Sequence, residues 1–314
     1  MKPSIWLRVS FVVIMIVPAW GANLRACPVP ARPANGLFSR DNLVAWCIVP
    51  YDGKQRTPAQ RAEMLERIGL HKFAYDWRAK HLPGFDTELD ELAKHKIELT
   101  GVWFPDTLNA DAKFILDCLA KHHVHTQLWV ASWAKDGGDQ DAKVNAAAER
   151  MRPIAEAAAK IGCTLGLYNH GGWFGEPENQ IAIIQKLKQQ KITNVGIVYC
   201  LHHGFGDLDR FPELFGKMLP YLIAVNLNGT SKVPPGSGEP VVPVGWGKLD
   251  LSLLKVIKGS GYSGPIGIIN ESDEDAEGRL LDNIDGLNWL LPQLDGKPAG
   301  ERPKLRTWHA PAGQ

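Results

Sequence analysis

The 314-residue chain has no surplus of charge of either sign, because 35 Lys and Arg residues stand against 34 Asp and Glu residues, a net charge of +1. A surface that coats nucleic acid needs an excess of Lys and Arg, so we expect no nucleic-acid partner. Hydrophobic residues make up 45% and charged residues 22% of the chain. This balance excludes an intrinsically disordered protein.

The spacing of the cysteines indicates neither a metal site nor a disulfide framework. The five cysteines, at positions 27, 47, 118, 163 and 200, form no C-x-x-C pair and no zinc-like pattern. Their spacing is also unlike a disulfide framework, and a chain of this length can build its own hydrophobic core. We expect Cys47, Cys118 and Cys163 to be small buried apolar residues.

Long apolar runs are missing after the N-terminus, so we expect no membrane span. A basic start, the apolar run 9–17 and small residues at 19 and 21 are typical of a secretory signal peptide over residues 1–21. The protein is then exported, to the periplasm or the exterior. Residues 24–27 offer an alternative, a lipoprotein box with Cys27 as the anchor, although Arg25 fits that box poorly.

The sequence does have an eightfold alternation of short apolar runs and amphipathic segments. The runs begin near residues 44, 72, 98, 126, 164, 194, 222 and 265. Such alternation indicates βαβ units and a parallel sheet. No G-x-G-x-x-G follows an early strand, as in a doubly wound sheet, and eight near-even units favour closure. We predict a single-domain α/β fold, a (β/α)8 TIM barrel over 42–292, between a Pro/Gly-rich spacer at 22–41 and a C-terminal tail at 293–314.

Helix signals support this alternation. Residues 57–60, Thr-Pro-Ala-Gln, form a capping box that predicts a helix start, and Glu176-Pro177 opens another helix. Pro153 predicts a kink or a split in the helix after the fourth run, where the spacing is longer.

Tryptophan gathers where a TIM barrel binds its substrate, at the C-terminal ends of the strands. Six of the 11 Trp residues fall at or near the expected strand ends, at positions 77, 103, 129, 133, 173 and 246. Flat aromatic faces with amides, imidazoles and carboxylates between them suit a polar ring such as a sugar. For Trp129 and Trp103, packing inside the barrel is an equally good interpretation.

Two acids follow expected strands. Glu271 comes just after the apolar run 266–269, where it is a base, a metal ligand, or the capping partner of a helix that starts at Asp273. We favour the first two roles. Asp76 is the second acid, and an ion pair with Arg78 would make it structural instead.

Three histidines lie at strand ends on Gly-flanked turns, which favours function over packing. They are His170, His202 and His203, and strand alternation predicts that one of the adjacent pair points inward and one outward. We assign Glu271, His203 and His170 as catalytic candidates. The substrate-binding candidates are Asp76, Trp77, Trp103, Trp133, Asn169, Trp173, His202, Asn226, Asn228 and Trp246.

The Pro- and Gly-rich loop 229–248 is expected on the same face, either as a lid that carries Trp246 or as a plain insertion.

Two C-terminal segments resemble a known family. Residues 245–250, Gly-Trp-Gly-Lys-Leu-Asp, and residues 261–265, Gly-Tyr-Ser-Gly-Pro, followed by a short apolar strand, resemble the C-terminal part of the xylose isomerase-like barrels, the sugar isomerases and epimerases related to AP endonuclease family 2. The turn 169–171 and the position of His203 are also similar. The resemblance extends over most of 42–292 and implies a barrel that acts on sugars.

The resemblance also implies a divalent metal held by Glu, Asp, His and Glu, and this sequence departs from that set. Tyr168, Cys200 and Asn226 stand where the first three ligands are expected, and Glu271 is displaced by about two residues. Hard cations prefer several carboxylate oxygens, so the set is not carried over. A softer ion, Mn or Zn, held by His170, His203 and Glu271 is the alternative.

Three functions follow from these residues. The strand ends carry few groups that bind phosphate, so we expect a small, non-phosphorylated carbohydrate as the partner. The first function is a sugar isomerase or epimerase that removes a proton next to a carbonyl. The alternatives are a 3-keto-glycoside lyase or hydratase that acts by β-elimination, and a non-catalytic sugar-binding barrel. Nothing in the sequence indicates an oligomeric state.

Overall fold

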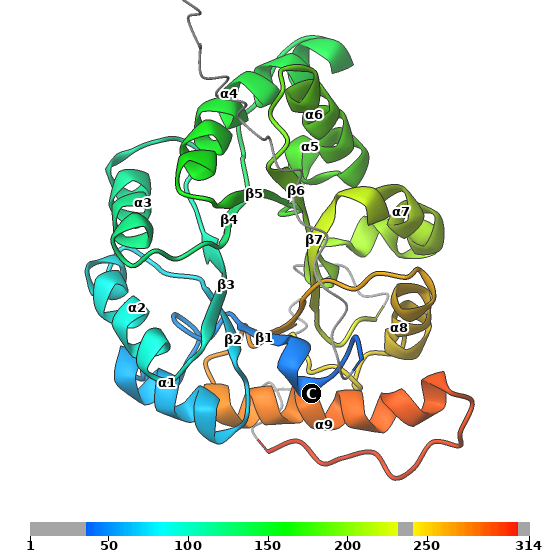
Figure 1. Ribbon diagram of the computed structural model, residues 1–314. Helices are drawn as coiled ribbons and strands as arrows, with labels where there is room; N and C mark the ends of the chain where they lie inside the picture. Colours follow the sequence, from blue (N-terminus) through cyan, green and yellow to red (C-terminus); the bar gives the residue numbers. More distant parts are fainter. Residues whose placement is uncertain (1–35, 232–240, 307–314) are drawn as a thin grey trace, which may run out of the picture.

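Eight parallel strands close into a barrel in the computed structural model, which describes residues 36–231 and 241–306. The strands are β1 Leu43–Trp46, β2 Lys72–Tyr75, β3 Glu98–Trp103, β4 Gln127–Val130, β5 Thr164–Tyr168, β6 Val195–Cys200, β7 Leu222–Leu227 and β8 Ile266–Ile269. Each strand pairs in parallel with the next, and β8 pairs with β1. Figure 1 shows the resulting ring of strands. The predicted (β/α)8 TIM barrel is confirmed.

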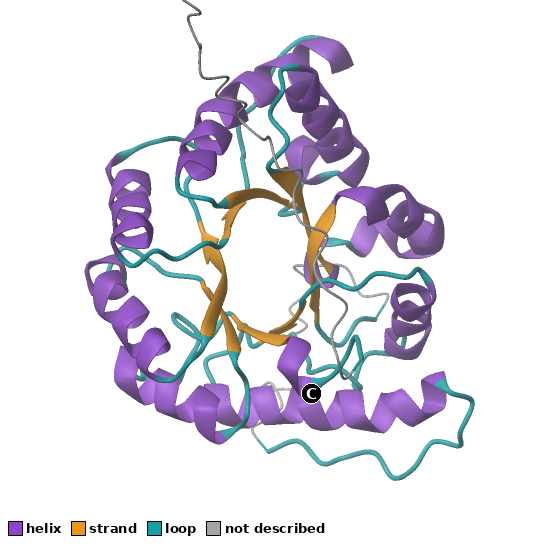
Figure 2. Cartoon of the chain, viewed as in Figure 1, coloured by secondary structure: helices purple, strands orange, loops and turns teal. Residues whose placement is uncertain are grey.

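Helices form a layer around the outside of the strand ring (Figure 2). They are α1 Pro58–Arg67, α2 Phe85–Lys94, α3 Ala110–Lys121, α4 Gln140–Lys160, α5 Gly172–Gly175, α6 Pro177–Gln189, α7 Phe211–Met218, α8 Asp250–Gly259 and α9 Ala276–Leu294. No helix within the described ranges is long and apolar enough to cross a bilayer.

Local signals set the helix boundaries as predicted, with one exception. The Thr57 hydroxyl accepts the backbone N–H of Gln60, and the Gln60 side chain accepts the backbone N–H of Thr57, so the capping box that starts α1 is present. Pro177 opens α6. The predicted split at Pro153 was wrong, because α4 continues through this residue as a single 21-residue helix. Proline removes one backbone hydrogen bond there, while buried residues on both sides of it hold the helix against the barrel.

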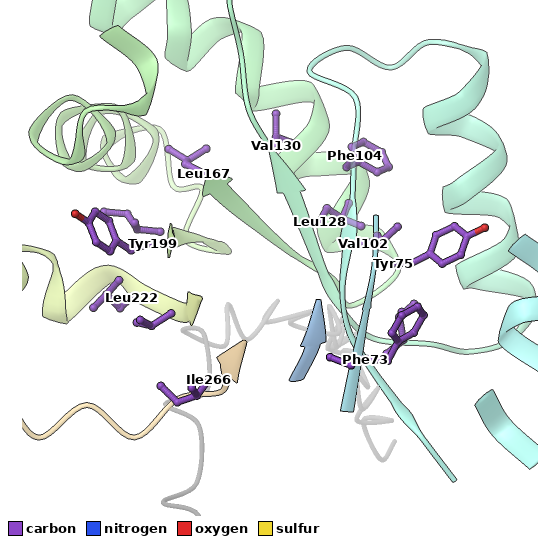
Figure 3. Packing of buried hydrophobic residues seen from close by; sticks show 14 of the residues in the cluster. Phe73, Tyr75, Val102, Phe104, Leu128, Val130, Leu167, Tyr199, Leu222 and Ile266 are labelled. Atoms are coloured by element: carbon purple, nitrogen blue, oxygen red, sulfur yellow. The ribbon is translucent and has the colours of Figure 1, made fainter. Parts of the chain in front are cut away.

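The hydrophobic core has two layers, one between the strands and the helices and one inside the barrel. Side chains such as Phe73, Tyr75 and Leu167 fill the outer layer (Figure 3). Trp129 fills the inner layer and is 0% exposed, so packing is its role. Gly101 makes room for it, since a Cβ there would lie 2.4 Å from the indole ring.

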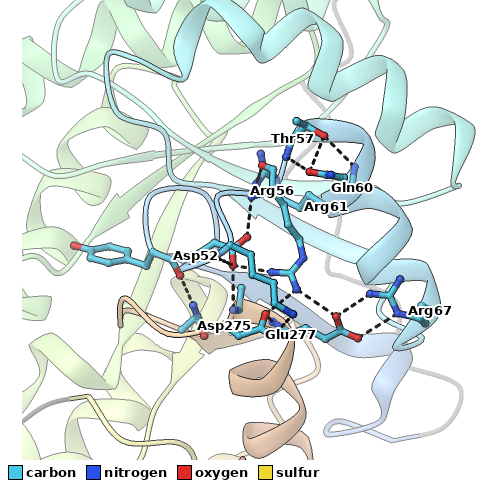
Figure 4. Close-up of polar contacts among 12 residues, drawn as sticks. Asp52, Arg56, Thr57, Gln60, Arg61, Arg67, Asp275 and Glu277 are labelled. Carbon is cyan, nitrogen blue, oxygen red and sulfur yellow. Dashed lines mark hydrogen bonds and ion pairs between the residues drawn. The ribbon is translucent and has the colours of Figure 1, made fainter. Parts of the chain in front are cut away.

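A polar network ties the loop after β1 to the start of α9 (Figure 4). The Arg56 guanidinium bonds to Asp52 at 2.7 Å, to Asp275 at 2.7 Å and to Glu277 at 3.3 Å. Asp52 also accepts the backbone N–H of Ala276 at 3.3 Å. Because β1 and β8 are neighbours in the barrel, this network holds together the two loops that carry Tyr51 and Glu271.

The predicted burial of the cysteines is confirmed for Cys47, Cys118 and Cys163, which are buried free thiols. The predicted signal peptide, the anchor at Cys27, and most of the spacer lie outside the described residues, as do residues 232–240 of the predicted lid and residues 307–314 of the tail.

Candidate functional site

A cavity of about 390 Å³ opens at the C-terminal end of the barrel, the end that carries the active site in TIM barrels. Its described lining residues are Trp46, Cys47, Tyr51, Asp76, Trp77, Arg78, Ala79, Trp103, Trp133, Tyr168, His170, His203, Ile269 and Glu271. The predicted candidates that meet here are Asp76, Trp77, Trp103, Trp133, His170, His203 and Glu271. The structure therefore brings together all three catalytic candidates.

Aromatic side chains make up a large part of the lining of this cavity. The Trp46 and Trp103 rings lie 6.4 Å apart between centroids, and Trp103 meets Tyr168 edge-on at 5.2 Å. The indole N–H of Trp46 donates to the Tyr168 hydroxyl at 3.1 Å, and that of Trp77 donates to the Trp103 carbonyl at 2.7 Å. These bonds fix the rings as rigid faces.

Trp133 is different, because its side chain stands at the rim and is 62% exposed. Its ring approaches that of His170 edge-on, at 5.2 Å between centroids. One large indole face is therefore open to the solvent beside the cavity.

The two cavity histidines are close neighbours and are uncharged. The rings of His170 and His203 lie 4.1 Å apart. Burial lowers the pKa of His170. Burial, followed by the nearby His170 and His202, lowers the pKa of His203 to about 3. Each ring therefore offers one N–H donor and one acceptor nitrogen at neutral pH.

The predicted alternation of the adjacent histidines was wrong, because β6 ends at Cys200 and a 3₁₀ turn, Leu201–His203, follows. A turn does not alternate like a strand. His203 lines the cavity, and His202 faces the acid, with its Nε2 3.7 Å from Glu271 Oε2.

Glu271 stands two residues beyond β8 on the cavity wall. The Tyr51 hydroxyl donates to its Oε1 at 3.5 Å. Burial and the Glu271 charge raise the pKa of Tyr51, so that the phenol stays protonated and can donate. The capping role is excluded, since α9 begins at Ala276 and is capped by Asp275.

Asp76 follows β2 directly and is 3% exposed. Its Oδ1 accepts the backbone N–H of Val49 at 3.2 Å. The ion pair considered for Arg78 does not form, because that guanidinium donates to the backbone carbonyls of Asp76 and Trp77 at 2.8 and 3.0 Å. Burial raises the pKa of Asp76 to about 7.

Three predicted amides lie in the barrel wall and outside the cavity lining. Asn169 bridges two strands: its side chain donates to the Cys200 carbonyl at 3.0 Å and accepts the Cys200 N–H at 2.7 Å. Asn228 donates to the carbonyl of Gly229 at 2.9 Å. Asn226 is 0% exposed, and neither of its amide atoms has a hydrogen-bond partner among the described residues.

Two predicted tryptophans also lie elsewhere. Trp173, in α5, donates to the Gln140 side chain at 3.0 Å, which directs it toward α4. The guanidinium of Arg302, in the C-terminal segment, stacks 5.0 Å from the Trp246 ring and 4.9 Å from the Trp289 ring of α9. Trp246 thus packs against the tail.

The predicted site candidates did not include several lining residues, above all Trp46 and Tyr168. Both are the last residue of a strand and point into the barrel with the inner cluster. Alternate residues of a strand point to the same face. This period of two could have predicted that Trp46 and Tyr168 point inward, once one inward residue, such as Trp129, was known.

The residues at the positions of the resembling family's metal do not fit a divalent ion. The Tyr168 hydroxyl accepts a hydrogen bond from Trp46, and burial raises the pKa of that phenol well above its usual value. Burial raises the pKa of the Cys200 thiol to about 12. Asn226 has no charge. Across residues 36–231 and 241–306, no group of three or more His, Cys, Asp or Glu side chains is placed to hold a metal, and His170, His203 and Glu271 are no exception.

The arrangement suits proton transfer on a bound polar ring. Aromatic faces can stack on C–H groups, Glu271 can accept a proton, and neutral imidazoles can donate hydrogen bonds to an oxygen on which charge develops.

Three solved structures with the same fold bear the names of different enzymes. The chain superposes on 3-keto-D-glucoside 4-epimerase from E. coli with a TM-score of 0.57 and 14% identity, covering 80% of this chain and 98% of that one. For D-psicose 3-epimerase in the presence of D-fructose the TM-score is 0.51 and the identity 14%, covering 73% and 84%. For the probable 3-DHS dehydratase AsbF from Bacillus anthracis the TM-score is 0.59 and the identity 13%, covering 78% and 98%.

At these identities the likeness shows the fold alone, and no curated protein sequence is similar enough to count as a match. A family model gives the more specific result. The model of the xylose isomerase-like TIM barrel family matches residues 110–292, more than half of the chain, and the protein therefore belongs to that family.

Proposed function

We propose that this protein is an enzyme that interconverts isomers or epimers of a small, non-phosphorylated sugar by removing a proton from the carbon next to a carbonyl. The observation that carries the proposal is the joint placement of Glu271 and the neutral pair His170 and His203 in one aromatic-walled cavity. Epimerases among the structures with the same fold support this class of reaction.

Each group has one task in the proposed reaction. Glu271 takes the proton from the carbon, and the electron pair moves toward the carbonyl oxygen. The N–H groups of His170 and His203 donate hydrogen bonds to that oxygen as its negative charge grows. A neutral imidazole is suited to this, because it stabilises charge while remaining a weak acid.

The preference for an unphosphorylated substrate follows from the charge of the lining. Arg78 carries the positive charge among the described lining residues, and its guanidinium already donates to two backbone carbonyls and approaches the Tyr51 hydroxyl at 3.4 Å. These three contacts engage three of the five N–H donors of the guanidinium, whereas a phosphate group is usually bound by several charged or backbone donors together.

A second candidate is β-elimination from a 3-keto-glycoside, which begins with the same proton removal and expels the group attached at the next carbon. The open face of Trp133 at the rim favours it, since a leaving group could stack there. A probable dehydratase is among the structures with the same fold, and dehydration is an elimination reaction.

The test is incubation of the mature protein with free sugars and 3-keto-glucosides in D₂O, with products and deuterium incorporation followed by NMR. We expect deuterium at the carbon next to the carbonyl. Glu271→Gln should lower kcat about 100-fold or more. Glu98→Gln is the matched control, because Glu98 is exposed at the opposite end of the barrel, at the start of β3. Sugar binding without exchange or turnover across the panel would favour a non-catalytic sugar-binding barrel instead.

We also propose that the protein is exported with residues 1–21 as a cleaved signal peptide. N-terminal sequencing of the protein recovered from the producing cells tests this. A mature chain that begins at residue 22 supports it, and a lipid-modified Cys27 at the N-terminus would favour the anchor.

A further inference from the structure

Asp76 and Glu271 stand on opposite sides of the same strand end. In the barrel β1 lies between β8 and β2, so Asp76, just after β2, and Glu271, just after β8, flank the end of β1. Two strand spacings separate their backbones by about 10 Å. Both side chains line the cavity, so a sugar bound there lies within reach of both carboxyl groups.

One oxygen of the Asp76 carboxyl accepts a hydrogen bond, and the other has no hydrogen-bond partner among the described residues. Oδ1 accepts the Val49 N–H, and Oδ2 has no hydrogen-bond partner within the part of the chain that the structure describes. A buried carboxyl oxygen without a partner is costly, and a substrate hydroxyl or carbonyl oxygen would satisfy it.

The charged and titratable groups around Asp76 do not occupy that oxygen. Arg78 bonds to backbone carbonyls, and Arg61, from α1, makes two 3.0 Å bonds to Glu88. The remaining neighbours are Cys47, after β1, and Tyr75, on β2. Burial raises the pKa of both, so they stay uncharged.

We propose that Asp76 is a second catalytic residue, the acid that protonates the carbonyl oxygen of the sugar while Glu271 removes the proton from the neighbouring carbon. This deepens the proposed function and rests on it.

The proton transfers balance over one isomerisation. Glu271 takes the C–H proton, the C–C double bond forms as the carbonyl π bond breaks, and Asp76 gives its proton to the carbonyl oxygen, which yields an enediol. Asp76 then takes the proton from the other enediol oxygen as the new carbonyl forms, and Glu271 returns its proton to the other carbon. Both carboxyl groups end in their starting states, and no further reactant is needed.

The environment suits a group that must both give and take a proton. Burial raises the pKa of Asp76 to about 7, and acid–base catalysis is most efficient when the pKa lies near the working pH. Asp76 also completes a task that hydrogen bonds from His170 and His203 only begin: the two imidazoles stabilise the charge that grows on the substrate oxygen, and the proton from Asp76 neutralises it.

The test compares Asp76→Asn with a matched buried acid. Asparagine keeps the shape and can still accept the Val49 N–H, but it has no proton to transfer. Asp250 is the control, because burial raises its pKa to about 7 as well, although it bonds to the backbone N–H groups of Thr230, Gly245 and Gly247 outside the cavity lining. Circular dichroism and thermal melts verify the fold of each variant.

We expect Asp76→Asn to lower kcat by about 100-fold or more and to change KM less than threefold. The limb of the kcat–pH profile near pH 7, which the titration of Asp76 produces, should be lost in this variant. Asp250→Asn should keep that limb and a kcat close to that of the natural protein. Asp76→Ala, tested with added formate, gives a second readout, since partial rescue by a small acid is expected only of a proton-transfer role.

The outcomes separate the two proposals. An active natural protein whose Asp76→Asn variant keeps kcat within threefold would overturn the role of Asp76 and leave the proposed function standing. A natural protein that neither exchanges nor converts any sugar would overturn both. If Asp76→Asn does not fold, the absence of formate rescue in a folded Asp76→Ala variant overturns the proposal.

Discussion

The imidazole rings of His170 and His203 lie 4.1 Å apart with a 41° angle between their planes. Two positive charges at that separation repel each other strongly in a half-buried site, which is one reason why the pKa of His203 is lowered and its ring stays neutral. Burial is the larger cause, and it lowers the pKa of His203 to about 3 from an ordinary value of 6.5.

The lowered pKa of His203 predicts that the protein loses stability in acid. The unfolded chain binds a proton at His203 below about pH 6.5, whereas the folded protein does not until about pH 3. The unfolded state therefore binds more protons in this window, and the free energy of unfolding falls as the pH falls, by at most about 1.4 kcal/mol per pH unit. Between pH 6.5 and pH 4, His203→Gln should lose less stability than the natural protein in urea titrations.

His71→Gln is the control for this prediction, because His71 is exposed before β2. Asp76 and Asp250, whose pKa values are raised, act in the opposite direction over the same window. They do so equally in all three proteins, so the comparison between variants isolates His203. Parallel stability profiles for the natural protein and His203→Gln would contradict the prediction.

Trp133 should contribute to binding through its open ring face. Trp133→Ala is expected to raise KM for a glycoside about 5- to 30-fold, corresponding to about 1–2 kcal/mol of stacking on an exposed indole, while kcat changes little. Trp133→Phe should restore most of the affinity. Phe114→Ala is the control, since Phe114 is also exposed, at 38%, and lies on α3 outside the cavity lining. An equal KM for Trp133→Ala and the natural protein would remove Trp133 from the site.

The sequence predicted the barrel because the signals for it are local. Each strand is a short apolar run, some helices have a start signal of their own such as the Thr57 capping box of α1 or Pro177 of α6, and eight repeats can close in few ways. The effect of Pro153 depended on packing, because the buried face of α4 continues on both sides of it.

The site was only partly predictable, for a geometric reason. Glu271 and His170 follow their strands so closely that the strand end fixes where they lie. Trp173 lies farther from the end of its strand, in α5, where one hydrogen bond to Gln140 directs it toward α4. The period of two along β1 puts Trp46 on the same face as Val44, but which of the two faces points into the barrel depends on how the eight strands pair.

The Arg56 network should be important for stability. Arg56→Met removes the partner of Asp52 and weakens the hold on Asp275, and the Arg56 side chain is only 8% exposed. Breaking a buried ion pair leaves an uncompensated charge, so we expect a loss of about 3 kcal/mol in the free energy of unfolding. Arg67→Met is the matched control, because Arg67 binds Glu277 at 2.8 Å with a side chain that is 57% exposed. Its loss should cost less than about 1 kcal/mol. Equal losses for the two variants in urea titrations would contradict the buried role of Arg56.

Removal of divalent metals should leave the reaction intact, since the donors at the family's metal positions are a buried phenol, a buried thiol and an amide. The thiol of Cys200, with a pKa of about 12, is not a thiolate at neutral pH, and metals bind the thiolate. After exhaustive dialysis against EDTA, kcat and KM on the sugar identified in the exchange experiment should stay within twofold of the untreated protein. A loss of more than tenfold, restored by Mn²⁺ or Zn²⁺, would instead favour a metal at His170, His203 and Glu271. In that case the EDTA-treated His203→Gln variant should regain no activity when the metal is added. This variant therefore decides between a direct role of the neutral imidazole and a role as a metal ligand.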